Sequence, residues 1–119
     1  MTQVVLRVVE PTREELIARV RALVALAQTT HTDSSSWVIR PTSLDAERLE
    51  QTPDMAKLQE LVGGWLTTAS SPWLPGFTMF IHDEALMVES PEINLVASLL
   101  YNTGHPICGT VVLVPNAHA

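Results

Sequence analysis

The sequence predicts an α+β fold, in which three helices pack on a mixed or mostly antiparallel sheet of about five or six strands. An apolar extended stretch, a helix-capping residue and apolar residues at helical spacing follow one another three times along the chain. The chain has 119 residues, of which 46% are hydrophobic, so it can form one core and is too short for two domains. We therefore expect a single domain over residues 1–119, with its helices on one face of the sheet.

The N-terminal part predicts a strand followed by a helix. Positions 3–9 are rich in valine and otherwise mostly apolar, with Arg7 as an interruption, which is typical of a strand that is covered on both faces. Thr12 and Glu15 have the spacing of a capping box, and apolar residues then recur at helical spacing as far as about Gln28. We expect this helix to begin at Thr12 and to be the most regular element of the chain.

The next part predicts a loop, a short strand and a second helix. The polar run 29–36 has no period and indicates a surface loop, and Trp37–Arg40 is a short extended segment. Residues 43–51 fit a short helix and an edge strand equally well. Thr52 is a good N-cap, so we expect a helix from Pro53 to Val62 that ends at a pair of glycines.

The second half predicts a small antiparallel meander. Residues 65–70 and 77–82 alternate like strands, and the loop 71–76 between them contains two prolines and a glycine. Asp83 and Glu84 are suited to a tight turn, after which 86–89 resumes as a third strand.

A third helix and a last strand complete the expected elements. Ser90 as the cap and Pro91 as the first residue predict a helix that runs to Tyr101. The apolar run 107–114 predicts an interior strand, because it is apolar on both faces, and the tail 115–119 is expected to fray.

Charge and cysteine content exclude several classes of protein. Seven basic residues against thirteen acidic ones give a net charge of −6, which argues against binding to a nucleic acid backbone. The single cysteine, Cys108, lies in an apolar run and is expected to be a buried, unreactive thiol. No signal peptide or membrane span is recognisable, so we expect a cytoplasmic protein that does not bind membranes.

No residue pattern predicts catalysis, a metal or a cofactor. The four histidines have no ligand spacing, and no second cysteine accompanies them. His82 and Asp83 are adjacent and resemble an acid–base pair, but neighbouring residues on a turn do not face one substrate. Phosphate-binding loops and nucleophile elbows are also lacking, so the sequence favours a protein that is not an enzyme.

The tryptophans are the best candidates for ligand contacts. Trp65 is expected in the core, whereas Trp73, on the loop 71–76, fits an interface anchor and a lid folded over the core equally well. A ligand cleft is expected to use polar residues together with Trp73. The predicted ligand-binding residues are Trp73, Arg40, Asn94, Tyr101 and His82. For Asn94, a hydrogen bond to the backbone at its helix start is the preferred alternative.

From Trp37 onward the chain resembles a family of phages, plasmids and actinobacterial genomes known as domain of unknown function 3846. The matching motifs are VIRP at 38–41, LQELVGGWL at 58–66, FTMFIHDEALM at 77–87, PEINLVASLL at 91–100 and the closing ICGTVVLV. The resemblance covers residues 37–114 and leaves 1–35 as an N-terminal strand–helix extension. It implies a cytoplasmic accessory protein of a phage or mobile element in a bacterial host, and it implies no reaction.

Two functions follow as expectations. The first is a non-catalytic accessory protein that binds a small signal molecule, with a nucleotide as one candidate, or a host defence protein. Stoichiometric capture requires a deep pocket or one that is shared in a homo-oligomer. The second is a structural, self-assembling protein without a ligand, in which residues 1–35 drive the association.

Overall fold

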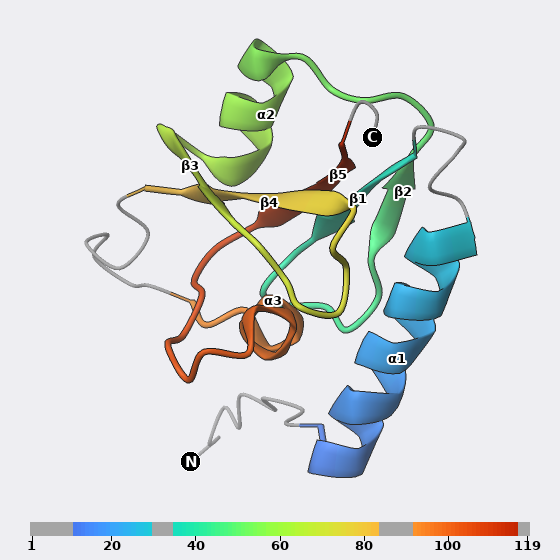
Figure 1. Cartoon of the computed structure of the whole chain (residues 1–119). Helices are drawn as coiled ribbons and strands as arrows, with labels where there is room; N and C mark the ends of the chain where they lie inside the picture. The colour runs from blue at the N-terminus through green and yellow to red at the C-terminus, as the bar shows by residue number, and fades with distance from the viewer. Residues whose placement is uncertain (1–10, 30–34, 84–91, 117–119) are drawn as a thin grey trace, which may run out of the picture.

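The computed structural model describes residues 11–29, 35–83 and 92–116, and it confirms the α+β fold. Three helices and five strands are present in these residues. They are α1 (Arg13–Thr29), β1 (Ser36–Ile39), β2 (Glu47–Leu49), α2 (Met55–Val62), β3 (Leu66–Ala69), β4 (Phe77–His82), α3 (Leu95–Tyr101) and β5 (Val111–Pro115). The strands form one sheet in the order β2-β1-β5-β4-β3, and every pairing is antiparallel (Figure 1).

The last strand, β5, is the centre of the sheet. Leu113 pairs with Trp37 of β1 on one side and with Met79 of β4 on the other. All five residues of β5 are buried, which confirms the predicted interior strand. The strand begins later than expected, at Val111, because Gly109 has a positive φ of 80° and interrupts the extended run. It also includes Pro115, which pairs with Phe77 and does not fray.

The helices lie on both faces of the sheet, so the prediction that they share one face is wrong (Figure 1). Side chains alternate along each strand, and β5 therefore contributes Val111 and Leu113 to one core and Val112 and Val114 to the other. α1 and α3 close the first and larger core, and α2 closes the second. We call these two sides the α1/α3 face and the α2 face.

The starts of α2 and α3 differ from prediction, whereas the start of α1 agrees with it. Thr12 caps α1 as expected, since its hydroxyl accepts a hydrogen bond from the Glu15 N–H. α2 is capped by Asp54 instead of Thr52, because the Asp54 carboxylate accepts from the Lys57 N–H at 2.8 Å and aspartate is the better cap. The predicted C-terminal end is confirmed: Gly63 has a φ of 91° and its N–H donates to the Gln59 carbonyl.

α3 begins later than predicted, at Leu95, with Asn94 as its N-cap. Asn94 is preferred because it also bonds to the sheet, as described below. Residues 43–51 fitted a short helix and an edge strand equally well, and the structure shows the edge strand β2, of three residues. The predicted strands at 3–9 and 86–89, and the predicted cap Ser90, lie outside the described residues. Within the described part of the chain, no helix is both long and apolar enough to span a membrane.

Candidate functional site

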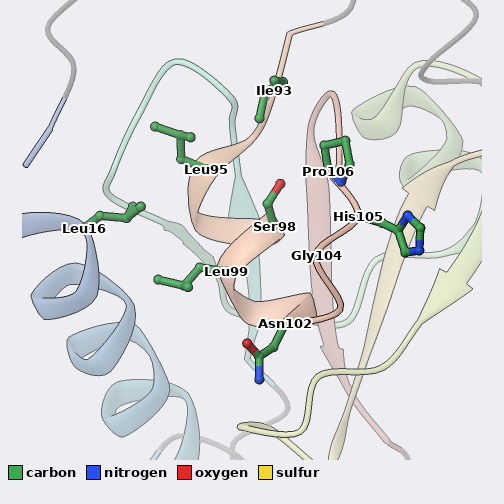
Figure 2. A pocket seen from close by; sticks show the side chains of 9 residues that line it. All are labelled: Leu16, Ile93, Leu95, Ser98, Leu99, Asn102, Gly104, His105 and Pro106. Carbon is green, nitrogen blue, oxygen red and sulfur yellow. The ribbon is translucent and has the colours of Figure 1, made fainter. Parts of the chain in front are cut away.

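An open groove of about 390 Å³ lies on the outer side of α3, between the first turns of α1 and the loop that follows α3 (Figure 2). Nine residues line it, and most of them are apolar. They are Leu16, Ile93, Leu95, Ser98, Leu99, Asn102, Gly104, His105 and Pro106. Figure 2 shows the side chains of Leu95 and Leu99 directed toward Leu16 of α1, with His105 on the opposite side of the groove.

Large apolar side chains of the groove are exposed to solvent. Ile93 and Leu95 are 53% and 40% exposed, although they are neighbours at the start of α3. Leu16 and Leu99 are half-buried and extend the same apolar surface into the larger core. Clustered apolar side chains at a concave surface are typical of a binding site, whereas a single exposed leucine is not.

α3 is fixed to the sheet by Asn94, whose residue exposure is 0%. Its Nδ2 donates to the backbone carbonyls of Ile39 and Gly109, each at 2.9 Å, and its Oδ1 accepts from the Ala97 N–H. One side chain thus joins the helix start to β1 and to the approach to β5. The structure gives Asn94 the structural role that was the preferred alternative, and its amide hydrogens have no remaining capacity for a ligand.

The far side of the groove is fixed by Ser98 and by the turn after α3. The Ser98 hydroxyl accepts from the Ile107 N–H at 2.8 Å and donates to the Ile107 carbonyl. The chain reverses at Asn102 and Gly104, which both have positive φ. The apolar lining residues of α3 therefore lie on a short helix that hydrogen bonds hold in place at both ends.

The groove is suited to an apolar group and has few means of holding a charged one. No lysine, arginine, aspartate or glutamate is among its lining residues. Its hydroxyl, on Ser98, is occupied by Ile107, which leaves the exposed Asn102 and His105 at the rim as the polar side chains. No group of three histidine, cysteine or acidic residues able to hold a metal exists in residues 11–29, 35–83 and 92–116.

The structure does not gather the five predicted ligand-binding residues in this groove. Arg40 is exposed at the end of β1 and forms an ion pair with Glu47 of β2. Tyr101 packs half-buried on the α1/α3 face, at the end of α3, whereas His82 is at the end of β4 and lies on the α2 side. Trp73 is on the loop before β4, outside the groove lining. Asn94 lies in the core beneath the groove.

His82 packs against Gly64, directly after α2. A Cβ added at Gly64 would lie 2.2 Å from the His82 Nε2, so only glycine leaves room for the imidazole. The Nδ1 of His82 is buried and has no hydrogen-bond partner among the described residues. A half-buried imidazole under a glycine is a packing arrangement, so His82 belongs to the end of β4, whereas its neighbour Asp83 is exposed in a turn.

The tryptophans also differ from prediction. Trp65 is 73% exposed, so its predicted place in the core is wrong. It precedes the edge strand β3, where Leu66 instead turns toward the α2 face and packs on the second core. Trp73 is 52% exposed, and its neighbour Leu74, at 1%, is the residue that folds over the larger core. The buried tryptophan is Trp37, in β1.

Sequence reasoning missed the groove because the helix predicted from Pro91 to Tyr101 includes Ile93. Ile93 has helical spacing to Val96, Ala97 and Leu100, which are all buried as that pattern predicts. The helix starts only at Leu95, however, so Ile93 lies before it and stays exposed. The useful signal was Asn94 itself, since an N-cap residue at this position would have placed Ile93 outside the helix.

The fold and the groove define a small three-layer α/β/α domain with an apolar groove on the outer side of α3. The model of the family described as Domain of unknown function (DUF3846) matches residues 36–118, and the chain therefore belongs to this family. The match starts at the first residue of β1, so α1 lies outside it. Neither the curated proteins nor the solved structures contain a match to the chain.

Proposed function

We propose that this protein is a non-catalytic binding protein, and that it holds an apolar segment of a protein partner in the groove between α1 and α3. The observation that carries the proposal is the exposure of Ile93 and Leu95 beside the half-buried Leu16 and Leu99. Leaving neighbouring large apolar residues in water is unfavourable by about 25 cal/mol for each Å² of apolar surface, and a partner removes that cost.

A protein partner fits the groove better than a nucleotide does. A nucleotide brings phosphate charge, for which the groove has no lysine or arginine, and the whole chain carries a net charge of −6. The lining also contains no phenylalanine, tyrosine or tryptophan on which a base stacks. Aliphatic side chains of a partner need neither charge nor stacking.

The proposal keeps the cellular setting that the family resemblance implies. The protein is then an accessory protein of a phage or mobile element in the bacterial cytoplasm, and it captures a host protein stoichiometrically. Nanomolar capture corresponds to about −12 kcal/mol, more than one small groove provides. The groove therefore serves as the anchor of a larger interface, in the way that a few apolar residues dominate most protein interfaces.

The alternative, a self-assembling protein driven by the N-terminal extension, receives less support from α1. The buried residues of this helix, Val20, Leu23 and Ala27, all belong to the larger core of the same chain. α1 thus uses its apolar face within the protein and is not left free to join a second copy through that face.

Thermal shift measurements with cyclic and ADP-ribose-type nucleotides test the choice of ligand. A nucleotide at a hundred times its dissociation constant adds about 2.7 kcal/mol and raises the melting temperature by roughly ten degrees for a domain of this size. We expect no shift from any member of the panel. A shift of that size would overturn the choice of a protein partner and restore the nucleotide.

Fluorescence of the neutral apolar dye Nile red tests the groove. We expect dye emission to rise with the wild-type protein and with Met55→Asp, but to fall sharply with Leu95→Asp. Met55 is a matched control, because it is 59% exposed and belongs to α2 on the other face of the sheet. Equal emission from the two variants would show that the groove is not the apolar binding surface.

A further inference from the structure

Among the described strands, β3 lies at one edge of the sheet. β3 is the last strand in the order β2-β1-β5-β4-β3, and among the described strands it pairs with β4 alone. An edge of this kind presents backbone N–H and C=O groups that another strand can bind. The residues along this edge therefore indicate which kind of strand can pair with it.

The hydrogen-bond pattern identifies the groups that face outward. The Asp83 N–H donates to the Trp65 carbonyl at 2.8 Å, so Trp65 and Asp83 are a hydrogen-bonded pair. Such pairs alternate along an antiparallel ladder, which makes Thr67 and Ala69 the next residues bonded to β4. The backbone groups of Leu66 and Thr68 consequently point away from β4.

The opposite side of β4 gives the same assignment. The Asn116 N–H donates to the Gly76 carbonyl, and the register pairs Thr78 with Val114 and Phe80 with Val112. These even-numbered residues of β4 therefore bond to β5, which leaves the odd-numbered ones for β3. The two ladders agree, and Leu66 and Thr68 are assigned to the free edge from both sides.

The side chains along this edge do not oppose pairing. Residues 65–69 read Trp-Leu-Thr-Thr-Ala, with no charge and no proline, which are the usual means of protecting an edge. The other edge strand, β2, has three residues, and its exposed Glu47 and Arg48 are charged. Trp65 adds a large exposed side chain at the start of the free edge.

We propose that β3 pairs antiparallel with β3 of a second copy of this chain, about a two-fold axis at Thr67. Thr67 is the midpoint of the segment 65–69 that β4 holds extended. In this register Leu66 exchanges hydrogen bonds with Thr68 of the second copy, and the symmetric pair doubles them. Trp65 then lies opposite the small Ala69 of the second copy, and the two Thr67 side chains face each other.

A second copy fits this edge because the pattern is its own complement. The outward groups at Leu66 and Thr68 are one donor and one acceptor each, at equal distances from Thr67, so the same strand turned by two-fold rotation satisfies all of them. The contact is short and belongs to the weak, transient class of interface. Each copy carries a net charge of −6 and the edge carries none, so we expect added salt to strengthen the dimer.

Disulfide trapping of Thr67→Cys tests the register. At a non-hydrogen-bonded antiparallel pair the two Cα atoms lie about 4.5 Å apart, within the range that a disulfide spans. The native Cys108 is buried and does not compete. With oxidised glutathione (the disulfide) as the oxidant, which is reduced to two thiols, we expect Thr67→Cys to give a covalent dimer at least about tenfold faster than Thr42→Cys, whose position is an exposed turn after β1.

Sedimentation of the wild type and of Thr68→Pro tests the hydrogen bonds. The Thr68 N–H is assigned to the free edge, so proline removes a donor to the second copy and leaves the bonds to β4 intact. We expect wild-type dimer to increase with concentration, and its dissociation constant to rise about tenfold or more in the variant. Thr68→Lys is used if circular dichroism shows that the proline variant is unfolded. Equal trapping of the two cysteine variants, or a wild type that stays monomeric at all concentrations, would overturn the proposal.

Discussion

The two faces of the sheet are covered differently, and the face that two helices cover carries both the larger core and the groove outside it. α1 and α3 enclose the larger core on one face, whereas α2 alone closes the smaller core on the other. The groove lies on the outer side of α3, above a core that is already complete. Changes in the groove should therefore affect binding, while changes beneath it should affect stability.

The largest expected effect is the loss of Asn94, which attaches α3 to the sheet. Asn94→Ala leaves the carbonyls of Ile39 and Gly109 and the Ala97 N–H without their partner, and all of these bonds are buried or partly buried. We expect the free energy of unfolding, measured by urea denaturation, to fall by about 3 to 5 kcal/mol.

The control for this prediction is Asn102→Gly, at the other end of the same helix. Asn102 has a φ of 53°, which glycine adopts without strain, so we expect the free energy of unfolding to stay within about 0.5 kcal/mol. An Asn94→Ala variant as stable as the wild type would show that α3 is held by its apolar contacts alone.

Truncating one leucine on each face compares the two cores directly. Leu100 is fully buried in the larger core, and Leu58 of α2 is 5% exposed in the smaller one. We expect Leu100→Ala to lower the free energy of unfolding by about 4 kcal/mol and Leu58→Ala by about 2.5 kcal/mol, because the single helix can relax onto the sheet. A larger loss from Leu58→Ala would reverse the proposed ranking of the faces.

A smaller effect is expected where α2 joins β3. Gly64→Ala forces the His82 ring to move, which should cost about 1 to 2 kcal/mol of unfolding free energy. The same substitution in a His82→Ala background should cost close to nothing, since the ring that it meets is gone. Equal costs in both backgrounds would mean that the contact between Gly64 and His82 is not the reason for the glycine.

The smallest effect on stability is expected in the groove itself. Leu95→Asp changes a residue that is already 40% exposed, so the free energy of unfolding should change by about 0.5 kcal/mol or less. Thermal melts of Leu95→Asp and Leu100→Ala compare the loss of stability at a groove residue and at a core residue of the same helix. A loss as large as that of Leu100→Ala would place Leu95 in the core and remove the basis for a binding surface.

The fold was largely predictable because its signals are local. The apolar spacing of α1, the glycine after α2 and the apolar run of β5 each specify an element through residues that are near in sequence. The helix covering each face was not predictable. Alternation along a strand shows that two faces are apolar, but a sequence alone does not tell which helix crosses to which side.

The candidate site was less predictable because it depends on residues that are distant in the chain. Asn94 becomes the start of α3 through its bond to the Ile39 carbonyl, 55 positions away. The groove joins Leu16 of α1 to Pro106 after α3, and no periodic pattern connects them. Trp65 was misplaced for a related reason, since its exposure follows from its position beside an edge strand.

The most direct test of the groove as the binding surface is photo-crosslinking from inside it. The photoreactive residue p-benzoylphenylalanine would replace Leu95 in one variant and Met55, on the other face, in a matched one, each expressed in the bacterial host that the proposed function assumes. The account predicts a discrete adduct with one host protein from position 95, and no such adduct from position 55. An adduct that forms only from position 55, or none from position 95, would contradict it.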